Sequence, residues 1–128
     1  MKKYLTEFIG TFFLVLTVVM CVNNPSLATM APIAIAGMYI AMFYAGSHIS
    51  GAHYNPAITV ALLMQRGIDR VDALYYILVQ LVASVLAAAF GVYLHDCEGG
   101  LNIVARVNEQ PACAVFGEFL GTFALTYV

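Results

Sequence analysis

The chain has 128 residues, of which 62% are hydrophobic and only 9% are charged, with a formal net charge of −2. Because ordinary soluble domains carry about a quarter charged residues, this composition, together with a mean hydropathy of +0.89, excludes a soluble domain and predicts an integral membrane protein. The few charges form no basic patch for nucleic acid. At about 20 residues per crossing helix, the chain has room for roughly four spans and is too short for a six-helix bundle.

Apolar segments follow one another along the chain and predict an all-α, polytopic helix bundle. Residues 5–22 are the first expected crossing helix, and they end in a polar turn at 23–26. Residues 29–47 are the second, and their small side chains would let membrane helices approach closely. Residues 72–94 are the third. A fourth apolar segment begins at residue 112 and is still running at residue 128.

A polar, glycine-containing stretch, residues 48–59, separates the second and third crossings. No Asp, Glu, Lys or Arg occurs from Phe8 to Gln65, so this stretch is expected within the bilayer and not on its surface. The apolar residues 56–65 would form a helix of about 15 Å, roughly half the hydrocarbon core. We therefore predict a re-entrant loop with a half-spanning helix, and an outer connection over residues 95–111.

The basic residues predict the orientation of the chain. Lys2, Lys3, Arg66 and Arg70 fall on one side of a three-crossing arrangement, and only Arg106 falls on the other. The positive-inside rule then places the N-terminus on the cytoplasmic side. The expected membrane is the cell membrane, either inner or plasma. On this topology, the polar stretch enters the bilayer from the cytoplasmic side.

One short motif recurs in the chain. Residues 7–12 (EFIGTF) match residues 118–123 (EFLGTF) at five of six positions. With three crossings between the copies, the second copy would run through the membrane in the opposite direction, as in the inverted repeats of many transporters. We therefore expect a first repeat over residues 1–111 and the truncated start of a second over 112–128. The counterpart of Asn55 would lie beyond residue 128.

Asn55 and Pro56 predict how the half-helix begins. Asn is favoured at the N-cap and Pro at the first helical position, so the helix N-terminus would point toward the bilayer midplane. Its free N–H groups carry a partial positive charge of about half an elementary charge. The Asn55 amide can cap the helix with its oxygen and still direct its NH₂ group outward, toward a passing water. Non-helical backbone at this depth is tolerated where it lines a water-filled cavity or is buried in protein, so we interpret the stretch as part of a pore.

Residues 50–57 (SGAHYNPA) resemble the first signature loop of the aquaporin family, the major intrinsic proteins. The position of the loop between the second and third crossings agrees with this resemblance, as do the half-helix after it and the Glu-x-x-x-Thr element on the first helix (Glu7, Thr11). The resemblance covers essentially the whole chain but only the first half of the family's fold. It implies a passive channel for water, and for small uncharged solutes such as glycerol, that excludes protons and ions.

The resemblance also assigns roles to individual residues. Asn55 would donate to water in the channel, and Ile35 would belong to the outer selectivity constriction, where an aliphatic residue implies a wider opening than in strict water channels. Glu7 would brace the loops, with Thr11, His48 and Glu118 as further structural residues. The expected partners are lipid, water, neutral solutes and a second half of the fold, in a homotetramer with one pore per subunit. The pore-lining residues would be Gly51, Ala52, His53, Tyr54, Asn55, Pro56 and Ala57.

Other interpretations remain open at this point. A four-helix, dimeric, proton-coupled exporter acting through Glu7 would fit the chain length. Hydrolase chemistry at Ser50 with His48 or His53 is disfavoured, because no carboxylate lies nearby in the sequence and the site is in a membrane. Metal binding by His48 and His53 is equally disfavoured, and we expect no enzyme activity, cofactor or metal. Residues 2–21 also resemble a secretory or lipoprotein signal, which the early Glu7 disfavours. The three thiols are expected to be buried or idle, although Cys97 and Cys113 fall near one face of the membrane, where they could pair.

Overall fold

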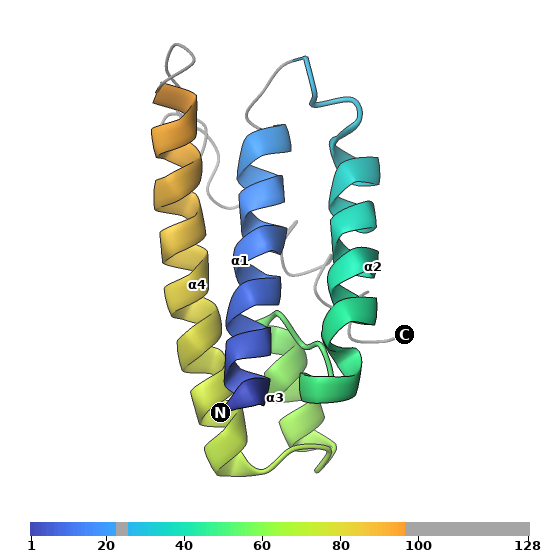
Figure 1. The fold of residues 1–128 in the computed structure, drawn as a ribbon. Helices are drawn as coiled ribbons and strands as arrows, with labels where there is room; N and C mark the ends of the chain where they lie inside the picture. The colour runs from blue at the N-terminus through green and yellow to red at the C-terminus, as the bar shows by residue number, and fades with distance from the viewer. Residues whose placement is uncertain (23–25, 97–128) are drawn as a thin grey trace.

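The computed structural model describes residues 1–22 and 26–96, which form four helices (Figure 1). Three are long and apolar enough to cross a membrane: α1 (Lys2–Val22), α2 (Ala31–Ser50) and α4 (Arg70–Asp96). The fourth, α3 (Pro56–Met64), has nine residues, so its length is about 14 Å, roughly half the hydrocarbon core. The predicted all-α class, with three crossings and one half-length helix, is confirmed.

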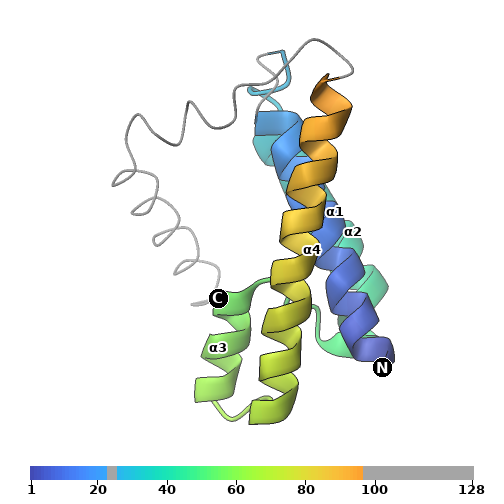
Figure 2. The ribbon, with the colours of Figure 1, turned by 90° about the vertical axis from the view of Figure 1, so that its left-hand side faces the viewer.

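The helices lie in the order α2, α1, α4, α3, and within the described part of the chain each one packs only against its neighbours in this order. The segment after α2 turns back into the bundle, so α3 starts near mid-height and returns to the end from which the segment entered (Figure 1). Figure 2 shows α3 beside the first half of α4. The chain therefore enters the bundle and leaves it on the same side.

Small side chains bring α4 close to α1. Ala83 and Ala87 of α4 are fully buried. A Cβ atom added at Gly91 would overlap the side chain of Val19 on α1. Small residues at such contacts let helix backbones approach closely in membranes, where dispersion contacts replace the hydrophobic effect as the driving force.

Large apolar side chains cover the outer faces of the helices. Ile33 on α2, Met64 on α3 and Val85 on α4 are each more than two-thirds exposed. Contact between so many apolar side chains and water would be unfavourable. Contact with lipid tails is not, because the tails are as apolar as these side chains. The outer faces therefore fit a bilayer environment.

Two helices, α2 and α4, continue beyond their predicted ends. The second crossing was expected to end at residue 47, but α2 continues through Ser50. It ends there because Gly51 has a left-handed backbone (φ +88°), and its N–H donates to the Ser47 carbonyl at 3.0 Å. At the other end of α4, the helix continues to Asp96, so the outer connection does not begin at residue 95.

Several predictions concern residues outside the described part of the chain. These are the fourth apolar helix from residue 112, the remainder of the outer connection, Glu118, and the pairing of Cys97 with Cys113. Cys21 lies half-buried on α1 as a free thiol.

Candidate functional site

Asn55 caps α3 in the manner that its sequence predicts. Its backbone is extended (φ −150°, ψ 129°), and its Oδ1 atom accepts a hydrogen bond from the Ala57 N–H at 2.8 Å. Pro56 occupies the first turn of α3. A backbone N–H at this position would have no partner within the helix, so the proline loses no helical hydrogen bond. Because the cap uses the side-chain oxygen, the Asn55 NH₂ group remains available to other acceptors. Asn55 is half-exposed in the described structure.

The loop that leads to Asn55 has an unusual backbone. Gly51 has φ +88°, and two residues with side chains, Ala52 and Tyr54, have φ +54° and +50°. The left-handed region costs a non-glycine residue of order 1–3 kcal/mol and persists only where the surroundings impose it. The loop must therefore be held by contacts with the rest of the bundle.

Glu7 of α1 provides the main contact. Its carboxylate is fully buried and accepts four hydrogen bonds. Oε1 accepts from the Ser50 hydroxyl at 2.6 Å and from the His53 N–H at 2.9 Å. Oε2 accepts from the Tyr54 N–H at 2.7 Å and from Gln80 Nε2 at 2.9 Å. Among the described residues the partners of Glu7 are all donors, and four of them use the accepting capacity of the two carboxylate oxygens.

These bonds also determine where the loop carbonyls point. In a trans peptide unit the N–H and the preceding C=O point in opposite directions, and the described residues contain no cis bond. The N–H groups of His53 and Tyr54 point at Glu7, and that of Ala52 points at the Ser50 hydroxyl at 3.1 Å. The carbonyls of Gly51, Ala52 and His53 are therefore turned to the opposite side of the loop. Among the described residues, no backbone N–H donates to these three oxygens.

Gln80 of α4 and Thr59 of α3, both fully buried, extend this hydrogen-bond network. Gln80 Nε2 lies 3.2 Å from the Thr59 hydroxyl, which is 3.1 Å from His53 Nδ1. The same Gln80 nitrogen contacts Glu7. One amide therefore joins the carboxylate on α1 to the first turn of α3.

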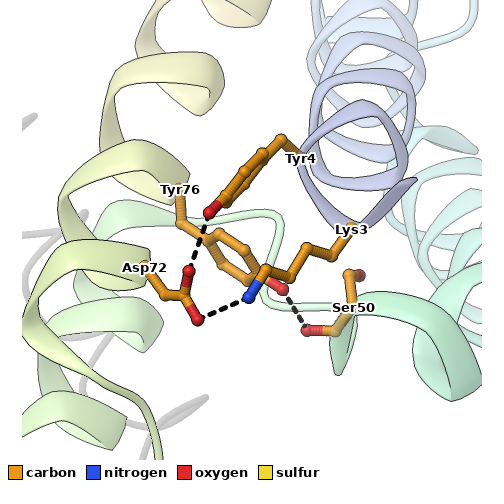
Figure 3. A network of polar contacts seen from close by, with 5 residues as sticks. All are labelled: Lys3, Tyr4, Ser50, Asp72 and Tyr76. Carbon is orange, nitrogen blue, oxygen red and sulfur yellow. Dashed lines mark hydrogen bonds and ion pairs between the residues drawn. The ribbon is translucent and has the colours of Figure 1, made fainter. Parts of the chain in front are cut away.

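Tyr76 lies one turn before Gln80 and holds the end of α2. Its hydroxyl donates to the Ser50 carbonyl at 2.8 Å (Figure 3), and its ring packs edge-on against His53 with centroids 5.0 Å apart. Beside it, Asp72 accepts from the Tyr4 hydroxyl at 2.7 Å and forms an ion pair with Lys3 (Figure 3). The start of α4 is thus tied to the start of α1.

Replacing Tyr76 by Phe tests this tether. The ring packing stays, but the buried Ser50 carbonyl loses its donor, so we expect the free energy of unfolding to fall by about 0.5–1.5 kcal/mol. Thermal unfolding in detergent would measure the change. Tyr75→Phe is the matched control, because Tyr75 is 49% exposed and its contact within the described structure is made by the ring, with Tyr4. Equal melting temperatures for the two variants would contradict the proposed tether.

A polar cavity of about 470 Å³ opens where α2 ends and the α3–α4 turn begins. Its wall includes the loop residues Ser50, Gly51 and His53 and, from the turn, Arg66 and Asp69. The cavity gives the loop access to the end of the bundle that carries Lys3. Within the described residues, no group of three or more His, Cys, Asp and Glu side chains could hold a metal ion.

The remaining predicted site residues within the described part of the chain are Thr11 on α1 and Ile35 and His48 on α2. Thr11 lies one turn after Glu7 and is buried, and its hydroxyl has no hydrogen-bond partner among the described residues. Ile35 is half-exposed on α2. His48 was expected to brace the loop, but it is exposed. Because α2 extends to Ser50, the two intervening steps of about 100° turn His48 away from the face that Ser50 presents to Glu7.

Sequence reasoning assigned no role to Gln80, Tyr76 or Thr59. A signal was present on α4, because Asp72, Tyr76 and Gln80 are spaced four residues apart and so form one polar stripe on an otherwise apolar helix. Polar side chains within a membrane span face the interior of the bundle. The stripe could therefore have identified the face of α4 that meets the loop.

The whole sequence, residues 1–128, matches the family described as Major intrinsic protein. The chain belongs to the major intrinsic protein family. It is 34% identical to Aquaporin NIP1-1 of Arabidopsis thaliana over all of the chain and 48% of that protein. It is also 32% identical to Aquaporin PIP1-6 of Zea mays, over 96% of the chain and 46% of that protein. A third relative, Glycerol uptake facilitator protein-like 6 of Lactiplantibacillus plantarum, is 40% identical over 70% of the chain and 42% of its own length.

Membership of the major intrinsic protein family decides two of the open interpretations. The family is one of channels, so the chain is not an enzyme. The four-helix exporter agrees neither with this family nor with α3, which is too short to cross a bilayer. The chain spans about half the length of the curated relatives it matches.

Proposed function

We propose that the chain forms one half of a transmembrane pore that conducts water and small uncharged solutes such as glycerol, and that excludes protons and ions. One observation carries the proposal. Glu7 accepts hydrogen bonds from the backbone N–H groups of His53 and Tyr54 in the re-entrant loop. The carbonyls of residues 51–53 therefore remain free to accept hydrogen bonds, and they precede Asn55 along the chain. A water molecule could donate to these oxygens in turn and then meet the Asn55 NH₂ group.

The electrostatics at Asn55 support the exclusion of charge. The N-terminus of α3 carries a partial positive charge of about half an elementary charge, concentrated on the N–H groups of its first turn. This charge repels cations. A water whose oxygen accepts from the Asn55 NH₂ group must turn its hydrogens outward, which interrupts a chain of proton transfer. The positive end of a half-helix is a known barrier to protons and cations in pores.

We further propose that Ile35 belongs to the outer constriction, where its aliphatic side chain leaves more room than an aromatic ring would. This favours small polyols in addition to water. One of the relatives is named a glycerol uptake facilitator, and two others are named aquaporins.

The proposed pore needs an opposing half. We infer that a second segment built like residues 1–111, in the same polypeptide or in a second copy, supplies the facing loop, and that complete pores assemble as homotetramers. We propose that the N-terminus and the residues around Arg66 face the cytoplasm, because the positive-inside rule favours that side for basic residues. The cavity of about 470 Å³ would then be the cytoplasmic mouth of this half of the pore.

Reconstitution tests the proposal. The protein, expressed from its whole reading frame and purified, would be placed in lipid vesicles and mixed with hyperosmotic sorbitol or with glycerol in a stopped-flow instrument. We expect faster water efflux and faster glycerol entry than in empty vesicles of the same lipid, with no added proton leak. If helical, correctly oligomeric protein raises neither flux, the proposed function is wrong.

A further inference from the structure

The side chain of Tyr54 fills a seat between α1 and α2. It is only 3% exposed, and two glycines, one on each helix, make the space for its ring. A Cβ atom added at Gly10 would overlap the ring itself, and one added at Gly46 would overlap the hydroxyl. The loop therefore sends this side chain into the bundle, between the two helices.

Tyr54 is also bound at both ends. Its backbone N–H donates to Glu7 of α1 at 2.7 Å, and its hydroxyl donates to the Met42 carbonyl of α2 at 2.8 Å. Its φ of +50° lies in the left-handed region, which a tyrosine adopts only when its surroundings impose it. The two bonds fix the orientation of the residue immediately before Asn55.

The ring is not held by packing alone. A cavity of about 170 Å³ adjoins it, lined by Thr6, Ile9, Met42 and Ala45 in addition to the two glycines. The ring therefore has space into which it could shift. The hydroxyl bond to the Met42 carbonyl restricts such a shift, because a hydrogen bond is directional while apolar contacts are not.

We propose that Tyr54 is a positioning residue for the permeation path, and that the Met42 bond sets the orientation of the His53 carbonyl and the Asn55 amide on either side of it. This inference rests on the proposed function. The two groups are one residue away along the chain, so a rotation of the Tyr54 backbone moves both of them. Tyr54 contributes without its side chain touching the solute.

The first test replaces Tyr54 by Phe, which removes only the hydroxyl. In vesicles, we expect a several-fold lower water permeability per reconstituted protein and a changed ratio of glycerol to water permeability, while the protein still folds and assembles. Tyr44→Phe is the matched control, because Tyr44 lies on α2 and is 78% exposed. A role in folding alone would change the yield of assembled protein but not the permeability ratio.

The second test uses the clash at Gly46. A Cβ atom there would overlap the Tyr54 hydroxyl and would lie 2.6 Å from Thr6 Cγ2, so Thr6→Ser is introduced first to remove that methyl group. In this background, Gly46→Ala should reduce the yield of assembled protein and its water permeability. Adding Tyr54→Phe should restore both toward the values of Tyr54→Phe alone, because the next ring atom is 3.2 Å away. Losses that simply add would show that the hydroxyl does not occupy this seat.

The outcomes separate the inference from the function on which it rests. If the wild-type protein conducts neither water nor glycerol, the proposed function fails and the inference fails with it. If the wild type conducts and Tyr54→Phe has the same permeability and the same solute ratio, only the inference is overturned. Reduced permeability with an altered ratio, together with the Gly46 rescue, supports both.

Discussion

Replacing Glu7 by glutamine should lower the free energy of unfolding by at least about 1–3 kcal/mol, since one buried backbone N–H, that of His53 or that of Tyr54, would lose its acceptor. The substitution keeps the shape of the side chain but turns one oxygen into an NH₂ group. At Oε1 that group would face the Ser50 hydroxyl and the His53 N–H, and at Oε2 it would face the Tyr54 N–H and Gln80. Either orientation brings donors against donors.

Chemical or thermal unfolding in detergent would measure the effect. Asp69→Asn is the matched control, because it also converts an acid to its amide. Asp69 is exposed immediately before α4, and Asn is as good an N-cap as Asp, so a change within about 0.5 kcal/mol is expected. A Glu7→Gln protein as stable as the wild type would contradict the role of Glu7 as the acceptor that holds the loop.

Replacing Asn55 by aspartate should separate the cap from the pore. Asp caps a helix as well as Asn does, so α3 should remain folded. The NH₂ donors are lost, and a carboxylate oxygen takes their place. Because one hydrogen bond is worth about 1–1.5 kcal/mol, we expect water permeability to fall roughly five- to tenfold. The added negative charge should also raise the leak of cations or protons.

Asn55→Ala supplies the comparison, since it removes the cap as well as the donors and should destabilise the protein by about 1 kcal/mol. Stopped-flow light scattering and a pH-sensitive dye inside the vesicles would record water and proton fluxes for both variants. Asn55→Asp with normal permeability and normal proton exclusion would show that the Asn55 amide does not contact the permeating water.

The helices were predictable because their cause is local. Apolar runs long enough to span a bilayer, the charge-free interval from Phe8 to Gln65, and the Asn55-Pro56 pair each depend on neighbours in the chain. The structure has the corresponding elements, including the cap on α3. Glu7 could be singled out because an acid within a membrane span is costly and needs partners.

The partners of Glu7 could not be predicted from the residues alone. Gln80 is 73 positions away from it, and only the packing of α4 against α1 brings the two together. The directions of the Ser50 and His48 side chains could not be predicted for a different reason. A helix that continues three residues further turns each later side chain by about 100° per step, which moved Ser50 toward Glu7 and His48 outward. The seat of Tyr54 depends on two glycines from different helices, and no local pattern relates them.

The osmotic water permeability of vesicles that contain the protein, measured over a range of temperatures, tests the central claim most directly. The claim is that a loop held by Glu7 presents its carbonyls and the Asn55 amide to a continuous water path. It predicts a permeability well above that of empty vesicles, with a weak temperature dependence, because water exchanges one hydrogen bond for another along the path. A permeability and a temperature dependence equal to those of the lipid alone, with folded and assembled protein, would contradict it.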